Sequence, residues 1–194
     1  MKDPAVSRGS IASSAPLTAK TNFFEYMEVV ANSIEYFSGD ECNKAFESAA
    51  EKVAKYASEG PGSSGYLKLD QDFVTCSPMT DSKDLSILLS DLMGNVQGTV
   101  QYNNEKNGVA NVTNICAVML DVDPSNPDYY GRFVGLSKQY MNSSGLSCHD
   151  ISWNSTIEYL SATKKDPTNN ARPWTYQTCN EFGYYQTTDS TAQV

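Results

Sequence analysis

Apolar residues recur every three or four positions through most of the chain, the spacing that places them on one face of an α-helix. Stretches with this spacing have apolar faces centred on Val30, Ala49, Leu89, Cys116, Phe133 and Ile157. Gly39 and the pair Gly60-Pro61 interrupt the pattern and end the first two stretches. The sequence therefore predicts a mainly α-helical chain.

The ends of these predicted helices carry polar residues of the kinds that cap helices. Asn22 and Glu25 have the spacing of a capping box ahead of the first helix, and Asp81 or Ser82 can cap the third. The glycine-rich residues 60–65, GPGSSG, lack the Lys-Ser/Thr pair of a phosphate-binding loop and the G-x-S-x-G order of a nucleophile elbow. We interpret them as a flexible connector.

Two segments have a different character. Residues 7–16, SRGSIASSAP, are small and β-prone and end at a proline, which suits a short buried strand. Residues 172–190, RPWTYQTCNEFGYYQTTDS, are rich in aromatic and β-branched residues, which favours a strand followed by a loop. Within them Glu181 adjoins the apolar residues 182–185, so we expect a buried carboxylate there.

Length and charge narrow the classes of function. A chain of 194 residues can form one domain with a substantial core. Its net charge of −9 opposes nucleic-acid binding, which relies on Lys and Arg neutralising phosphates. It contains no run of about 18 apolar residues that could span a membrane, and its first ten residues lack the apolar region of a signal peptide.

Cysteines and glycosylation sequons nevertheless indicate a secretory origin. The chain has five cysteines without the spacing of a zinc site, so disulfides are the better interpretation. Sequons begin at Asn111, Asn142 and Asn154. An odd cysteine in a secreted chain usually has a partner elsewhere, and we expect this chain to be part of a longer polypeptide.

Few residues are candidates for chemistry within the chain itself. We interpret His149, beside Cys148, as an exposed or capping residue, and a triad built with Asp150 is disfavoured. The paired carboxylates at 70 and 72 and at 121 and 123 are expected to be solvated. Residues 121–128 lack the glycine and the terminal glutamate of a calcium loop, so we predict no metal and no cofactor.

Three segments together resemble a known family. They are GSIASSAP (9–16), SKDLSILLSDLMGNVQGTVQYN (82–103) and WTYQTCNEFGYYQTTDS (174–190). They resemble the serine carboxypeptidase family that includes lysosomal Pro-Xaa carboxypeptidase, the dipeptidyl peptidase of quiescent cells and thymus-specific serine protease. The resemblance implies the helical insert, or cap, domain of an α/β-hydrolase, with short strand segments of the hydrolase core at both ends.

The resemblance also implies boundaries and disulfides. Residues 1–20 would be a strand segment that follows the nucleophile elbow, 21–171 the insert, and 172–194 the return to the core at the edge of the substrate pocket. Its cysteine pattern pairs Cys42 with Cys116 and Cys76 with Cys148, and it leaves Cys179 for a partner downstream. The first pair also agrees with the apolar helix faces on which both cysteines lie.

In this family a serine attacks the carbonyl, a histidine transfers the proton and an aspartate orients the histidine. The resemblance places the serine before this chain and the other two after it, so the chain alone is predicted to be inactive and to need the remaining hydrolase core. It implies a secreted or lysosomal parent enzyme that acts on peptide substrates, and a homodimer is compatible with it.

Candidate pocket residues, carried over by the same resemblance, are Glu181, Phe182, Tyr184 and Gln186. Aromatic walls suit a proline ring, and the glutamate could hold a substrate amine. The alternative is that the aromatic residues are ordinary core and that Glu181 pairs with a backbone or arginine group. The alternative function is a truncated, non-catalytic helical module that binds peptides or a partner protein.

Overall fold

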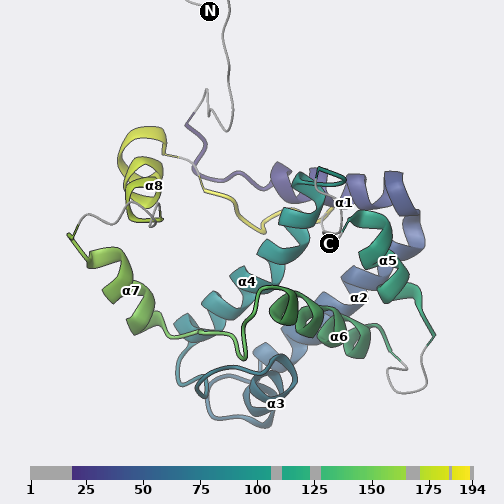
Figure 1. Cartoon of the computed structure of the whole chain (residues 1–194), viewed down its shortest axis with the longest axis horizontal. Helices are drawn as coiled ribbons and strands as arrows, with labels where there is room; N and C mark the ends of the chain where they lie inside the picture. Colours follow the sequence, from purple (N-terminus) through teal and green to yellow (C-terminus); the bar gives the residue numbers. More distant parts are fainter. Residues whose placement is uncertain (1–18, 106–110, 123–127, 165–170, 184, 193–194) are drawn as a thin grey trace, which may run out of the picture.

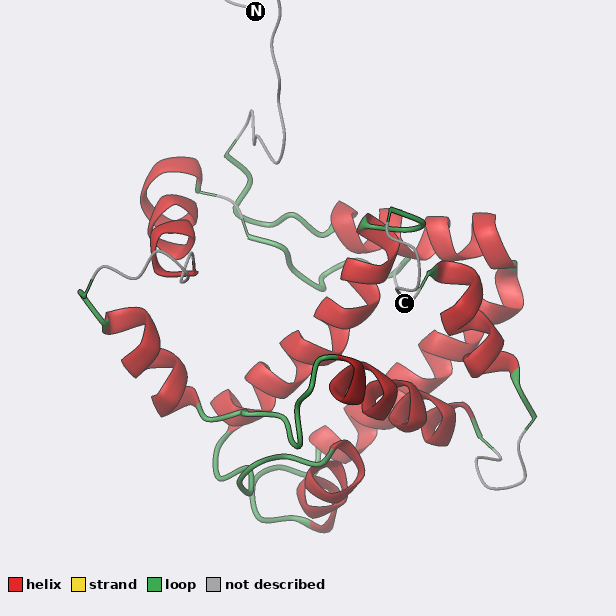
Figure 2. Ribbon diagram, viewed as in Figure 1, coloured by secondary structure: helices red, strands yellow, loops and turns green. Residues whose placement is uncertain are grey.

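The computed structural model describes residues 19–105, 111–122, 128–164, 171–183 and 185–192. The predicted strand at 7–16 lies outside them. The described residues form helices connected by loops and contain no strand (Figures 1 and 2), which confirms the mainly α-helical fold. Eight α-helices and one π-helix are described: α1 Glu25–Ser38, α2 Asp40–Ala57, α3 Ser64–Phe73, α4 Ser82–Gln101, α5 Val112–Leu120, α6 Tyr129–Ser143, α7 Trp153–Ser161, α8 Ala171–Gln177 and η1 Thr178–Phe182.

Helix α2 is the centre of the bundle and packs against α1, α3, α5 and α6. Its apolar residues recur at helical spacing, and Cys42, Ala45, Phe46, Ala49 and Val53 are all buried. Helix α1 contributes a matching face with Met27, Val30 and Ile34. The periodic pattern therefore identified the buried faces of both helices correctly.

Aromatic rings join α2, α3 and α6 at one end of the bundle. Phe73 is fully buried and lies edge-on to Tyr130 and Phe133, with ring centroids 6.1 and 6.0 Å apart. Phe133 also meets Phe46 at 6.1 Å, and Tyr130 meets Tyr56 at 5.5 Å. Such edge-to-face pairs add stability beyond the area that they bury.

Charged groups surround this aromatic cluster. The Tyr130 hydroxyl donates a hydrogen bond to Asp72 at 2.6 Å, and Lys68 contacts the same carboxylate at 2.8 Å. Burial of the ring and this hydrogen bond raise the pKa of Tyr130. Asp70 accepts hydrogen bonds from the Thr75 hydroxyl and the Met79 backbone. The expectation that these two aspartates are simply solvated is therefore wrong, because both hold structure together.

Both predicted disulfides are confirmed. Cys42–Cys116 joins the start of α2 to α5, with Cα atoms 5.5 Å apart, and Cys76–Cys148 joins the segments that follow α3 and α6. Beside the second bridge, Thr75 and His149 form an isolated parallel β-bridge. The His149 backbone accepts from Cys76 at 2.8 Å and donates to Val74 at 2.9 Å.

Some predicted helix ends differ from the structure. The capping box at Asn22 and Glu25 is wrong, because α1 starts at Glu25 without a side-chain cap. Glu25 pairs with Lys20, and Asn22 accepts a hydrogen bond from Thr187.

Asp81 does cap α4, as the sequence predicted. Helix α3, which the sequence reading did not anticipate, starts inside the glycine-rich connector, where Ser63 accepts from the Tyr66 backbone.

The largest correction concerns the C-terminal segment. Residues 171–182 are helical rather than extended, first as α8 and then as the π-turn η1. Together with α7 they form an arm that extends from the bundle (Figure 1), and none of the described residues of these three elements is buried. Helix propensities differ by only a few tenths of a kcal/mol between most residues, so local aromatic content did not decide the conformation.

After the arm, the chain returns to the point where the helices begin. Tyr185 donates its backbone hydrogen to Lys20 at 3.1 Å and accepts from Phe23 at 2.9 Å. Phe23 and Gln186 form an isolated parallel bridge. We refer to this pairing of residues 20–23 with 185–187 as the clasp.

The contribution of the α2–α5 disulfide to stability can be tested by mutation. Replacing Cys42 and Cys116 together by alanine should lower the free energy of unfolding by about 4 kcal/mol, because the bridge closes a long loop in the unfolded chain. The loop separation is 74 residues, and the second bridge closes a similar one of 72. Urea unfolding of both double variants gives the comparison, and a loss below about 1 kcal/mol would contradict the expectation.

Acid stability provides a second test. The ion pair with Lys52 at 2.7 Å and a hydrogen bond from the Gly131 backbone lower the pKa of Asp128 from its ordinary 3.8. A lowered folded-state pKa contributes stability that is present above the unfolded value and is lost as pH falls through the folded one. Asp128→Asn should therefore flatten the fall in stability below about pH 4. Urea unfolding at pH 7, 5 and 3 measures this, with exposed Asp189→Asn as control. Equal slopes for Asp128→Asn and the parent chain would disprove it.

Candidate functional site

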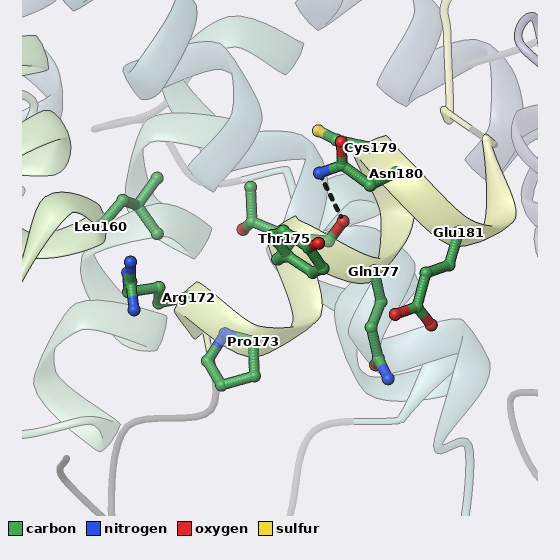
Figure 3. A pocket seen from close by; sticks show the side chains of 9 residues that line it. Leu160, Arg172, Pro173, Thr175, Gln177, Cys179, Asn180 and Glu181 are labelled. Atoms are coloured by element: carbon green, nitrogen blue, oxygen red, sulfur yellow. Dashed lines mark hydrogen bonds between the residues drawn. The ribbon is translucent and has the colours of Figure 1, made fainter. Parts of the chain in front are cut away.

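A pocket of about 660 Å³ lies in the arm, between the end of α7 and the α8–η1 segment (Figure 3). Its size falls within the range of sites for small ligands. Leu160 of α7 closes one side, and the other lining residues come from α8 and η1: Arg172, Pro173, Thr175, Tyr176, Gln177, Cys179, Asn180 and Glu181.

The helical turn that builds the pocket changes type within it. Helix α8 continues without a break into the wider π-turn, which ends at Gly183 with a φ of +60° and a hydrogen bond from its backbone to Thr178. The Asn180 amide donates to the Tyr176 carbonyl at 3.1 Å (Figure 3). Single π-turns often occur at functional sites.

The pocket carries one positive and one negative side chain. Arg172 lies at the end near Leu160, and Glu181 lies at the opposite end near Gln177 (Figure 3). Both are exposed, and among the described residues neither forms an ion pair with another side chain. The pocket can therefore offer opposite charges to the two ends of a ligand.

The predicted pocket residues are only partly brought together. Glu181 lines the pocket, but it is exposed and not buried as expected, because the segment folds as a π-turn that buries none of its residues. Phe182 is half-buried and its ring lies 6.1 Å from that of Trp174. Gln186 belongs to the clasp, and Tyr184 lies outside the described residues. Their role in binding remains a prediction.

Sequence reasoning missed Arg172 and Tyr176 as pocket residues. Read as a helix, the segment places Arg172, Tyr176 and Asn180 four residues apart on one face, which is the signal that could have found them. The strand interpretation would instead have placed neighbouring positions on alternate faces.

Cys179 also lines the pocket, and it is exposed and outside both disulfides, as the cysteine pattern predicted. Its hydrogen bond with Tyr185 raises the pKa of the tyrosine hydroxyl. Pairing with a cysteine downstream of this chain remains a prediction.

His149 is buried, with 5% of its surface exposed, so the expectation of an exposed histidine is wrong. Its Nε2 lies 3.2 Å from the Ser137 hydroxyl and its Nδ1 lies 3.8 Å from Asp91. The order serine, histidine, aspartate matches that of a hydrolase triad, but Ser137 is 3% exposed and does not line the neighbouring cavity. We interpret the group as a structural link between α4, α6 and the second disulfide.

The described residues offer neither a metal site nor a membrane-spanning helix. No group of three or more His, Cys, Asp or Glu side chains among them is arranged to hold a metal ion. None of the described helices is both long and apolar enough to cross a membrane.

The sequons occupy different surroundings. Asn142, in the last turn of α6, and Asn154, in the first turn of α7, are exposed. Asn111 is half-buried, caps α5 by accepting from the Asn114 backbone at 2.9 Å, and donates to Asn104.

The fold and the site define the class of protein: it is a disulfide-bonded helical domain with a two-charge pocket on an exposed arm. Comparison with known families then identifies it: serine carboxypeptidase S28 matches residues 1–194, and the chain belongs to this family of serine peptidases. It is 30% identical to thymus-specific serine protease of Mus musculus, over 96% of this chain and 38% of that protein.

Further relatives agree. Thymus-specific serine protease of Homo sapiens is 29% identical over 98% of this chain and 38% of its own length. A putative serine protease of Caenorhabditis elegans is 29% identical over 97% of this chain and 37% of its own length. The chain thus spans about two fifths of the length of these relatives. No solved structure matches it significantly.

Proposed function

We propose that this chain is the helical domain of a serine-type exopeptidase that hydrolyses short peptides, and that the arm pocket binds part of the peptide. The main support for this proposal is that the chain belongs to a serine carboxypeptidase family. The two-charge pocket supports it, because a short peptide has an amine at one end and a carboxylate at the other.

The clasp supports an insert in a larger domain. Lys20 and Tyr185 are joined by a hydrogen bond although 165 residues separate them, so the segments that flank the helical part lie side by side. Domains inserted into others have neighbouring ends for this reason. We propose that residues 21–171 form the insert, and that segments 1–20 and 172–194 connect it to a hydrolase core.

In this proposal the catalytic serine, histidine and aspartate belong to the remaining polypeptide. His149 is not a substitute, because it is buried and its hydrogen-bond partner Ser137 is inaccessible. The helical domain contributes binding and orientation: a peptide held at both ends reaches the nucleophile in fewer arrangements, which lowers the entropic part of the barrier.

Glu181 is the proposed partner of the peptide's amine. In the longer polypeptide that contains these residues, Glu181→Gln should raise KM for peptides with a free N-terminus by about tenfold, the loss expected for one charged hydrogen bond, and should leave N-acetylated peptides unaffected. Kinetics with matched acetylated and free proline-containing peptides measure this. A KM that changes equally for both peptides would refute the role, as would no change.

A second function has its own support. The pocket lies wholly within this chain, so a non-catalytic module that binds peptides or a partner needs no hydrolase core. Hydrolysis of a proline-containing fluorogenic peptide by the longer polypeptide, blocked by a serine-directed phosphonate, would favour the peptidase. Binding without hydrolysis would favour the module.

We further propose that the parent protein is a secreted or lysosomal glycoprotein, supported by the two disulfides and the exposed sequons at Asn142 and Asn154. Expression through the secretory pathway should attach a glycan to each, visible as a mass decrease on enzymatic deglycosylation. Asn142→Gln and Asn154→Gln should each remove one glycan, whereas an unchanged mass would contradict the proposal.

A further inference from the structure

Arg172 differs from the structural arginine of the bundle. Arg132 is buried, donates to the Met119 carbonyl at 3.0 Å and lies over the Tyr129 ring at 5.2 Å. Arg172 is exposed, faces the arm pocket and has no ion-pair partner among the described residues. The first arginine stabilises the fold, whereas the second is positioned to bind a negatively charged group of a ligand.

The surroundings of Arg172 suit a carboxylate attached to an apolar residue. Leu160 and Pro173 lie beside it (Figure 3), and Tyr176 adds apolar surface to the same pocket. Asn180 uses one of its amide hydrogens on the Tyr176 carbonyl and lies beside Cys179 (Figure 3), and the guanidinium is the charged donor at the Arg172 end. Its planar fork of N–H groups matches both oxygens of a carboxylate.

Charge also fixes the direction of the ligand. Glu181 at the opposite end of the pocket repels an anion, and the chain as a whole carries a net charge of −9. A carboxylate is therefore attracted to one end only. We propose that Arg172 binds the free C-terminal carboxylate of a short peptide and thereby selects peptides with an unblocked C-terminus. This inference rests on the proposed function, because it takes the arm pocket as a peptide site.

The test compares a tripeptide such as Ala-Pro-Phe with its C-terminal amide, by calorimetric titration of the 194-residue chain. The free acid should bind about tenfold more tightly than the amide, the effect of one charged hydrogen-bonded pair. Arg172→Gln should remove this preference. Arg172→Lys should keep part of it, because the charge remains but the fork is lost. The preference should decrease as salt rises, because the site is open to solvent.

Matched variants separate this role from general effects. Lys164→Gln removes the same charge from an exposed residue that does not line the pocket, and it should leave the preference intact. Glu181→Gln should weaken both peptides alike. Circular dichroism checks that each variant folds. Equal binding of acid and amide, a preference that survives in Arg172→Gln, or binding of neither peptide would overturn the inference.

Failure of this inference and failure of the proposed function can be distinguished. Hydrolysis by the longer polypeptide of amidated and free peptides at equal rates would keep the peptidase and overturn the role of Arg172. Arg172-dependent binding of the free acid, without hydrolysis by the longer polypeptide, would support this inference and overturn the peptidase.

Discussion

The edge-to-face packing of aromatic rings between α2, α3 and α6 is the interaction on which the rest of the bundle depends. Phe73 stands at its centre, fully buried, and touches Tyr130 and Phe133. Because protein interiors are close-packed, rings in contact fix the distance and angle between the helices that carry them. With α2 held in this way, the disulfide to α5 and the apolar face of α1 find their partners in place. Asp72 then accepts a hydrogen bond from the Tyr130 hydroxyl, which is the one polar group of that ring.

The arm, unlike the bundle, is not held by a buried core. Its described residues bury no side chain, and α7 packs against only α4 and α8 among the elements with substantial contact. Regions with few buried apolar contacts open at lower free energy than the core. A pocket built there can adjust to a ligand or to a neighbouring domain without disturbing the ring cluster. Exposed apolar residues such as Ile157, Trp174 and Tyr176 would gain most from such a neighbour.

The sequence predicted those features that depend on periodicity and on long-range constraints. The buried faces of α1, α2 and α4 follow from their apolar spacing, and both disulfides follow from the family resemblance. It failed where tertiary context outweighs local preference. Residues 171–182 have aromatic content typical of strands yet fold as helices. The strand interpretation therefore assigned the wrong side chains to a shared face and did not identify Arg172 as a pocket residue. The cap expected at Asn22 gave way to a hydrogen bond from Thr187, 165 residues away. Similarly, no local pattern shows that α4 and α6 enclose His149.

The clasp has a consequence for the order of folding. Its partners are among the most distant pairs in the chain, whereas each helix forms from residues close in sequence. Closing so long a loop is entropically costly until other contacts have shortened it. A ribosome would release Lys20 early and Thr187 only after every described helix has emerged. The clasp and the neighbouring hydrogen bond from Ser190 to Glu28 are then the last contacts that can form, and a nascent chain that has completed its bundle still has Lys20 and Thr187 apart.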